Sequence, residues 1–203
     1  MVVKDGMNAF ERFVKRLFDL FCSFFGLVVL SPVFLVVYIR LRIQNDGSVI
    51  FSQERIGYKG KSFHIYKFRT MRMDSESSGK PQLAAKGDER LTKVGRFLRE
   101  HHLDELPQLW NVFVGDMSFV GPRPERQYYI DQIMERNSDY KYLYLIRPGL
   151  TSLATIYNGY TDTIEKMLTR LQMDLDYLQK RSLFYDLKII VTTVLYIIKG
   201  KKF

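Results

Sequence analysis

The chain has 203 residues, of which 46% are hydrophobic and 26% charged, and its formal net charge is +9. This length suits one domain with its own core, and the basic excess favours an anionic partner such as a lipid surface, a phosphorylated metabolite or a nucleic acid. Cys22 is the only cysteine, which excludes a disulfide framework and a cysteine-rich zinc site.

An uncharged stretch, LFCSFFGLVVLSPVFLVVYI, runs from Leu20 to Ile39. An α-helix needs about twenty apolar residues to cross a bilayer, so this stretch is long enough to enter one. It is too long for a signal peptide, and no small-residue cleavage site follows it. Ser31 and Pro32 interrupt it, because a proline removes a helical hydrogen bond and bends the helix.

Basic side chains flank this stretch on both sides: Lys4, Arg12, Lys15 and Arg16 precede it, and Arg40 and Arg42 follow it. A spanning helix usually has Lys and Arg concentrated at one end. Positive charge at both ends is expected of a helix that enters and leaves by the same face, with both ends held at anionic headgroups. We therefore predict a tail over 1–12 and a re-entrant membrane helix over 13–43, with a straight span as the alternative.

Residues 44–203 are predicted to form one compact domain. Over 47–71, apolar and polar residues alternate on either side of a YKGK turn, which predicts a β-hairpin whose second strand carries Lys67. Residues 73–90 are polar and contain glycine and proline, so they read as a long loop of the kind that forms lids or is disordered.

The rest of this domain reads as helical. One helix is predicted to start after Thr92, and a second, with an apolar stripe over 106–113, to end at Gly115. Further helices are predicted in 124–137 and 161–181. Residues 183–203 hold an apolar run too short to span, followed by lysines, which favours an amphipathic interfacial helix. A core helix with a basic tail is the alternative. The fold class is α/β, mostly helical with a small β-hairpin.

The stretch LDELPQLWNVFVGDMSFVGPRPE, residues 103–125, begins with an acidic pair, Asp104 and Glu105. Pro107 has no N–H and is tolerated only in the first turn of a helix, so the pair lies at or just before a helix N-terminus. The free amides there favour carboxylates by about 0.3–1 kcal/mol each. A helix start alone is therefore a sufficient explanation of an isolated acidic pair.

Basic residues at rigid positions point to more than a helix start. Pro122 and Pro124 restrict Arg123, which would be a helix N-cap if Pro124 were the first helical residue. Arg147 precedes a Pro-Gly turn, for which we predict type II geometry. Together the candidates for a polyanion site are Lys67, Arg99, Arg123 and Arg147.

An acidic pair in a basic pocket suits phosphoryl chemistry, because one carboxylate can attack phosphorus while the other holds Mg²⁺. Two other classes of function remain open. His101 with Asp104 and Glu105 has the helical spacing of a zinc or transition-metal site. The other class is a non-enzymatic basic scaffold that binds nucleic acid or anionic lipid. The sequence contains no Lys/Arg block and no nucleic-acid module, which argues against it.

Taken in order, the motifs LSPVF, GSVIFSQERIG, FHIYKFRTM, R-x4-DELPQLWNV, GDMSFVGPRP, RPGLTS and DLKII resemble the bacterial sugar transferase family, the small monotopic phosphoglycosyl transferases. The resemblance covers nearly the whole chain, and DELPQLWNV followed by GDMSFVGPRP is highly specific. It supports the re-entrant helix broken at Ser31-Pro32. Many members read RPGITGWAQV where this chain has RPGLTSLATI, so its sugar contacts are left open.

The resemblance implies a Mg²⁺-dependent ping-pong transfer of a sugar-1-phosphate from a UDP-sugar to polyprenol phosphate, with release of UMP. Asp104 would be the nucleophile that forms an aspartyl-phosphosugar, and Glu105 the Mg²⁺ ligand. The implied substrate contacts are Pro122, Arg123 and Pro124 to the nucleotide, and Lys67, Arg99 and Arg147 to the phosphates.

The resemblance also implies a place in the cell. The catalytic domain would lie on the cytoplasmic face of the bacterial inner membrane and begin a glycan for exopolysaccharide, O-antigen, capsule or glycoprotein. Its partners would be the lipid bilayer and downstream membrane glycosyltransferases, with no nucleic acid. The extra N-terminal membrane helices of larger members do not occur in these 203 residues, so we expect a minimal catalytic unit.

Overall fold

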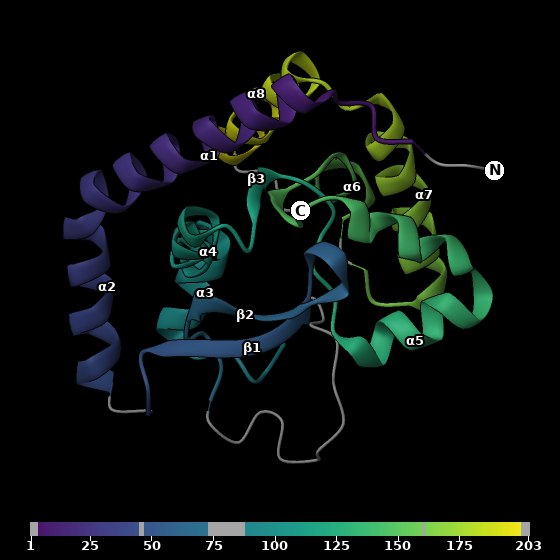
Figure 1. The fold of residues 1–203 in the computed structure, drawn as a ribbon. Coiled ribbons are helices and arrows are strands. Elements are labelled where there is room, and N and C mark those ends of the chain that lie inside the picture. Colours follow the sequence, from purple (N-terminus) through teal and green to yellow (C-terminus); the bar gives the residue numbers. More distant parts are fainter. Residues whose placement is uncertain (1–3, 45–46, 73–87, 160, 200–203) are drawn as a thin grey trace.

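The computed structural model describes residues 4–44, 47–72, 88–159 and 161–199. Two N-terminal helices form an arm that bends around one side of the remaining elements (Figure 1). These helices are α1 (Ala9–Val29) and α2 (Ser31–Gln44). The other elements are β1 (Ile50–Ile56), β2 (Ser62–Phe68), α3 (Lys93–Glu100), α4 (Gln108–Val114), β3 (Ser118–Val120), α5 (Gln127–Arg136), β4 (Gly149–Thr151), α6 (Leu153–Asn158), α7 (Ile164–Lys180) and α8 (Leu183–Ile198).

The chain is mostly helical with two small sheets, which agrees with the predicted α/β class. Strands β1 and β2 pair antiparallel, with Ile50 opposite Phe68, so the predicted hairpin is confirmed. A single 3-10 turn, Tyr58–Gly60, joins them. Strands β3 and β4 pair in parallel and were not predicted, because three-residue strands are too short to show an alternating pattern.

Both predicted helices around the acidic pair are present. Helix α3 begins after Thr92, whose side chain accepts a hydrogen bond from the amide of Gly95. Helix α4 ends at Gly115, which has a φ of 100° and so takes the left-handed conformation that glycine adopts most easily. The acidic pair lies in a 3-10 turn, Leu103–Glu105, directly before α4. The predicted loop over 73–90 falls mostly outside the described residues.

The break between α1 and α2 lies at the predicted position. Pro32 has no N–H, so the carbonyl of Val28 loses its helical donor; the hydroxyl of Ser31 replaces it at 2.7 Å. The two helices bend by 57°. Among the described residues no single helix is long and apolar enough to cross a bilayer, and α1 and α2 meet that test only as a bent pair.

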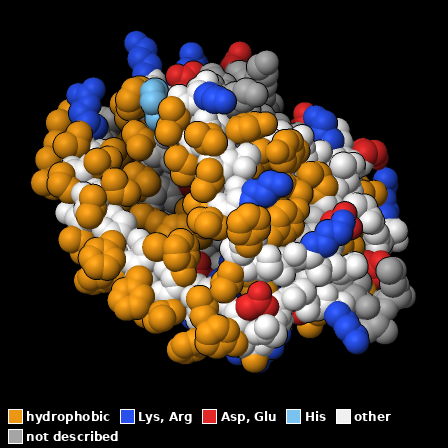
Figure 2. All heavy atoms as spheres, turned by 90° about the horizontal axis from the view of Figure 1, so that it is seen from above, with side chains coloured by type: hydrophobic (Ala, Val, Ile, Leu, Met, Phe, Trp, Pro, Cys, Tyr) orange, Lys and Arg blue, Asp and Glu red, His pale blue; other side chains and the backbone are white. Residues whose placement is uncertain are grey.

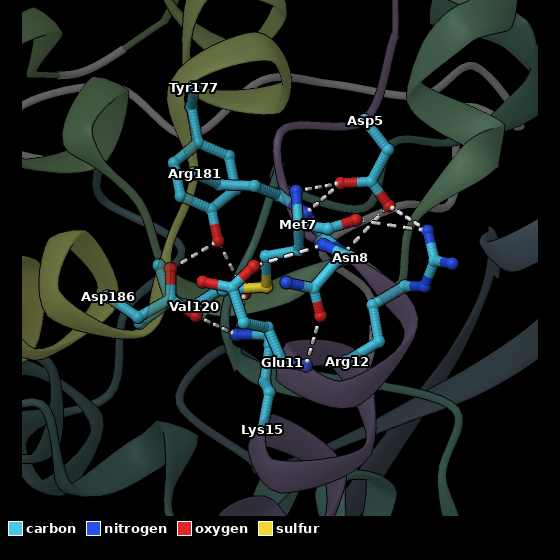
Figure 3. Close-up of polar contacts among 10 residues, drawn as sticks. All are labelled: Asp5, Met7, Asn8, Glu11, Arg12, Lys15, Val120, Tyr177, Arg181 and Asp186. Atoms are coloured by element: carbon cyan, nitrogen blue, oxygen red, sulfur yellow. Dashed lines mark hydrogen bonds and ion pairs between the residues drawn. The ribbon is translucent and has the colours of Figure 1, made fainter.

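Helix α1 is attached to the domain through a buried cluster (Figure 3). Lys15 donates to the carbonyl of Val120 at 3.0 Å and forms an ion pair with Asp186 on α8. Asp186 also accepts a hydrogen bond from the hydroxyl of Tyr177 on α7, at 2.6 Å. Lys15 was expected to face lipid headgroups, but these contacts hold it inside the protein.

A second set of ion pairs fastens the chain ahead of α1. Asp5 accepts from Arg181 at 2.6 and 3.1 Å and from Arg12 at 3.1 Å (Figure 3). Helix α1 begins at Ala9, inside the predicted tail 1–12, because Asn8 and Glu11 form a capping box at its N-terminus. We call Asp5, Arg12, Lys15, Tyr177, Arg181 and Asp186 the anchoring network.

The outer faces of α1 and α8 are apolar. On α8, large side chains exposed to solvent recur at helical spacing: Phe184, Leu187, Val191, Val194 and Ile198. On α1 the exposed set includes Phe10, Phe13, Phe21, Phe24, Phe25, Val28 and Val29. Figure 2 shows apolar side chains gathered over much of the face seen from above. The buried side of α8 is apolar as well, with Ile189 in the core and Ile190 and Tyr196 packed against it, so the predicted amphipathic interfacial helix stays a prediction.

Candidate active site

The acidic pair lies where α4 packs on β2. Asn111 of α4 is fully buried and bonds to the β2 backbone: its Oδ1 accepts from the amide of Tyr66 at 3.2 Å, and its Nδ2 donates to the carbonyl of His64 at 2.7 Å. This connection fixes the register of α4 against β2. It brings Lys67, the next residue on the strand, to Glu105 in the turn that precedes α4.

Glu105 is held as an anion. The Nζ of Lys67 donates to its Oε1 at 2.5 Å. Burial by itself would raise the pKa of Glu105, but the charges of Lys67 and Arg123 outweigh burial and lower the pKa to about 2. Glu105 is therefore ionised at neutral pH.

Asp104, unlike Glu105, is not paired with a basic side chain in the described residues. Its side chain is buried, with the residue only 6% exposed, and within the described part of the chain its carboxylate has no hydrogen-bond or ion-pair partner. Burial raises the pKa of Asp104 and the neighbouring Glu105 adds to this, while the charges of Lys67 and Arg99 oppose it. A carboxylate with free lone pairs in a basic field can act as a nucleophile.

Arg99 is placed by a close approach of α3 to the end of β2. Gly95 lies against the backbone of Thr70, where a Cβ atom would come 1.9 Å from the Thr70 carbonyl oxygen, so only glycine fits. Arg99 then reaches the Thr70 hydroxyl with its Nε at 3.1 Å. Its charge acts on Asp104 from this position.

Arg123 comes from the loop between β3 and α5. Its charge acts on Glu105, and its guanidinium has no hydrogen-bond or ion-pair partner among the residues that the structure describes. The prediction that it caps a helix is wrong: α5 begins at Gln127 with Arg126 as its N-cap, because the backbone of Pro124 and Glu125 bonds to β1 instead. A small hollow beside the loop is lined by Gly57, Pro122, Arg123, Pro124, Tyr140 and Tyr144, among others.

Arg147 is not brought to the acidic pair. Its Nε donates to the carbonyl of Gly115 at 2.7 Å, at the C-terminal end of α4, whereas the pair precedes the N-terminal end. A helix of this length spans about 10 Å. The predicted type II turn is also wrong, since Gly149 lacks a positive φ and begins β4. Glycine is needed there because a Cβ would lie 2.1 Å from the amide nitrogen of Gly121.

The donor set fits magnesium better than zinc. In the described residues no group of three or more His, Cys, Asp or Glu side chains could hold a metal ion. His101 is exposed, and its Nδ1 lies 2.9 Å from the carbonyl oxygen of Phe97, so the alternative zinc site is not formed. Mg²⁺ typically needs only one or two carboxylates, with phosphate oxygens and water as its other ligands. The ionised Glu105 meets that requirement.

Two features of the site were not found from the sequence. Glu125 is buried and accepts from Arg170 at 2.6 Å and from Arg55 at 3.4 Å. The only available signal was an acidic residue directly after GPRP. His102, next to the turn that carries the pair, has a φ of 54°, a strained conformation for a residue with a Cβ, and no sequence pattern indicated it.

Residues 10–200 match the family model described as bacterial sugar transferase. A UDP-glucose:undecaprenyl-phosphate glucose-1-phosphate transferase of Klebsiella pneumoniae is 42% identical over 190 residues, which are 93% of this chain and 41% of that protein. A UDP-N-acetylgalactosamine-undecaprenyl-phosphate N-acetylgalactosaminephosphotransferase of Aeromonas hydrophila is 36% identical over 93% of this chain and 44% of its own length.

These two relatives are more than twice as long as the matched region, so the chain spans less than half of each. A third relative has a similar length to this chain. The exopolysaccharide production protein PSS of Rhizobium leguminosarum bv. phaseoli is 38% identical over 94% of this chain and 98% of its own length.

Proposed function

The chain belongs to the bacterial sugar transferase family, and on that premise we propose that it moves a sugar-1-phosphate from a UDP-sugar to polyprenol phosphate and releases UMP. One observation carries the proposal: Asp104 is a buried carboxylate without a partner in the described chain, set beside an ionised Glu105 and three basic side chains. The printed names of the relatives, which include a UDP-sugar and undecaprenyl phosphate, support the choice of substrates.

The reaction proceeds in two displacements. A carboxylate oxygen of Asp104 attacks the β-phosphorus of the UDP-sugar; the bond from this phosphorus to the bridging oxygen breaks, and UMP leaves with the electron pair. A phosphate oxygen of the polyprenol phosphate then attacks the same phosphorus. Asp104 departs as a carboxylate, and the product is polyprenol-diphosphosugar.

The basic residues bind the donor diphosphate and stabilise the charge that develops on it. Within the described residues Arg123 has free guanidinium donors for this, and Lys67 and Arg99 add positive charge near the acidic pair. Glu105 would hold Mg²⁺, which would neutralise phosphate oxygens. Because Lys67 is bonded to Glu105 at 2.5 Å, it also orients that carboxylate.

The helical arm would supply the acceptor. We propose that α1 and α2 enter and leave the membrane by one face, with the bend at Ser31-Pro32 between them. The apolar surface of α1 continues onto α4, where the ring of Phe24 lies 6.2 Å from Phe113 and Phe113 lies 5.7 Å from Trp110. Since α4 follows directly after the acidic pair, a lipid against this surface would present its phosphate to Asp104 at headgroup height.

The direct test is a screen of UDP-sugars with polyprenol phosphate and Mg²⁺, using the full chain in detergent or nanodiscs. We expect UMP release and a lipid-linked product with at least one donor. Release of UMP from none of the donors would overturn the proposed function.

The proposed topology has a test of its own. Single cysteines at positions 4 and 47, in a Cys22→Ser background, should be labelled from the same side of the membrane. Labelling from opposite sides would show that the arm spans it.

A further inference from the structure

The loop that carries Arg123 is fastened on both sides of this residue. On the N-terminal side, the carbonyl of Pro122 accepts from the amide of Gly149 at 2.9 Å, and the amide of Gly121 donates to Thr151 at 3.1 Å. The two backbones are in direct contact, since a Cβ on Gly121 would lie 2.4 Å from the carbonyl oxygen of Arg147. The loop is therefore joined to β4 at this end.

On the C-terminal side, the fastening uses buried charges from two distant elements. Arg55 of β1 donates to the carbonyl of Pro124 at 3.1 Å and forms an ion pair with Glu125 at 3.4 Å. Arg170 of α7 donates to the other carboxylate oxygen of Glu125 at 2.6 Å. The amide of Ile56 adds a backbone bond to the carbonyl of Glu125 at 3.0 Å.

This buried arrangement is a costly way to obtain stability alone. Taking charges out of water is unfavourable, and apolar residues of similar volume often stabilise a fold at least as much as a buried ion pair does. The Nε atoms of Arg55 and Arg170 are buried without a hydrogen-bond partner in the described chain, which adds to that cost. The arrangement instead fixes the orientation of the backbone next to Arg123, because Arg55 and Arg170 hold this segment from two sides.

We propose that Glu125, together with Arg55 and Arg170, is a positioning unit that aims Arg123 at the diphosphate of the donor. This inference rests on the proposed function. Arg123 has no partner of its own in the described chain, so the direction of its guanidinium depends on the backbone that carries it. Without the unit, Arg123 remains charged and present, but it spends less time in the productive orientation.

A double-mutant cycle tests this on the full chain, with UMP release measured against UDP-sugar concentration. Glu125→Gln keeps the size of the side chain and removes its charge; we expect the KM for UDP-sugar to rise about tenfold with a smaller change in kcat. In an Arg123→Ala background, the same Glu125→Gln change should alter KM by less than about twofold, because Glu125 acts through Arg123.

Arg170→Gln provides a second, independent variant and should follow the same pattern. The matched control is Asp176→Asn, which removes an exposed ion pair with Lys180 on the same helix and should leave KM unchanged. Equal effects of Glu125→Gln in both backgrounds, or an unchanged KM, would overturn the positioning role. These results require an active parent enzyme, so they are distinct from a parent that releases no UMP, which would overturn the proposed function and this inference with it.

Discussion

The anchoring network and the candidate active site both hold buried and partly buried charged side chains, but the two regions differ in whether these charges are paired. In the anchoring network each charge has an opposite charge in contact, such as Asp5 with Arg181 and Lys15 with Asp186. In the candidate site, Asp104 and Arg123 have no such contact within the described chain. Paired buried charges hold elements together, whereas unpaired ones are available to a substrate.

The largest expected effect comes from removing the unpaired carboxylate. Asp104→Asn keeps the shape of the side chain but removes the nucleophile, so UMP release should fall by roughly 1,000-fold or more. The folded state should be retained or made more stable, because a buried charge without a contact is lost. Activity and thermal unfolding should be measured on the same preparation. Near-parental turnover would contradict the assignment.

A substitution in the anchoring network should instead lower the stability of the fold. Asp186→Asn removes the ion-pair partner of the buried Lys15 and leaves Asp19 as the nearby carboxylate, so the free energy of unfolding should fall by about 3 kcal/mol. Denaturant unfolding in a fixed detergent measures this change. The control, Asp176→Asn, breaks an exposed pair and should cost less than about 1 kcal/mol. If the two variants have equal stability, the anchoring network does not hold α1.

Asp174 on α7 is a further buried carboxylate, outside both the anchoring network and the acidic pair. Burial raises its pKa to about 7; the charge of Arg170 opposes this, Glu125 adds to it, and Tyr140 also faces the group. The unfolded chain loses this proton near pH 4 while the folded chain keeps it up to about pH 7. Stability should therefore fall as pH rises through this window, by at most roughly 4 kcal/mol, and stay level above it.

Asp174→Asn should remove this contribution. Unfolding measured at pH 5, 6, 7 and 8 should show a shallower decline for the variant than for the parent chain, and a more stable variant at pH 8. Identical pH dependence of the two proteins would mean that Asp174 is ionised in the folded state.

The smallest expected effect concerns the hydrogen bond between the Ser31 hydroxyl and the Val28 carbonyl. Ser31→Ala removes the hydroxyl that donates to the carbonyl of Val28 and should lower stability by about 1 kcal/mol, more in an apolar surrounding. Ser31→Thr keeps the hydroxyl and should lose little. Thermal unfolding of the three proteins in one detergent would decide this. Equal losses for alanine and threonine would show that the hydroxyl does not replace the missing amide.

The sequence predicted features that depend on local chemistry. Pro107, Gly115 and Thr92 mark helix ends through their own backbone or capping properties, and Pro32 marks the break in the same way. The hairpin followed from an alternating pattern. Lys67, Arg99 and Arg123 were grouped with the acidic pair as basic residues that could form a polyanion site with it, and the family resemblance supported that grouping.

Features that depend on distant contacts were missed or misread. Arg147 was placed with the phosphate ligands, yet its partner is the carbonyl of Gly115, which no local pattern reveals. Lys15 was assigned to the headgroups because its partner Asp186 lies far along the chain. The role of Glu125 was not predicted for the same reason, because its ion pairs with Arg55 and Arg170 form only in the folded structure.

The most direct test of the central claim is a search for the covalent intermediate. The protein is incubated with its UDP-sugar in the absence of polyprenol phosphate, and UMP and the mass of the intact chain are measured together. We predict up to one equivalent of UMP and a matching phosphosugar adduct that maps to Asp104 and disappears when polyprenol phosphate is added. UMP formed only in the presence of the lipid, with no adduct on the chain, would contradict a nucleophilic Asp104.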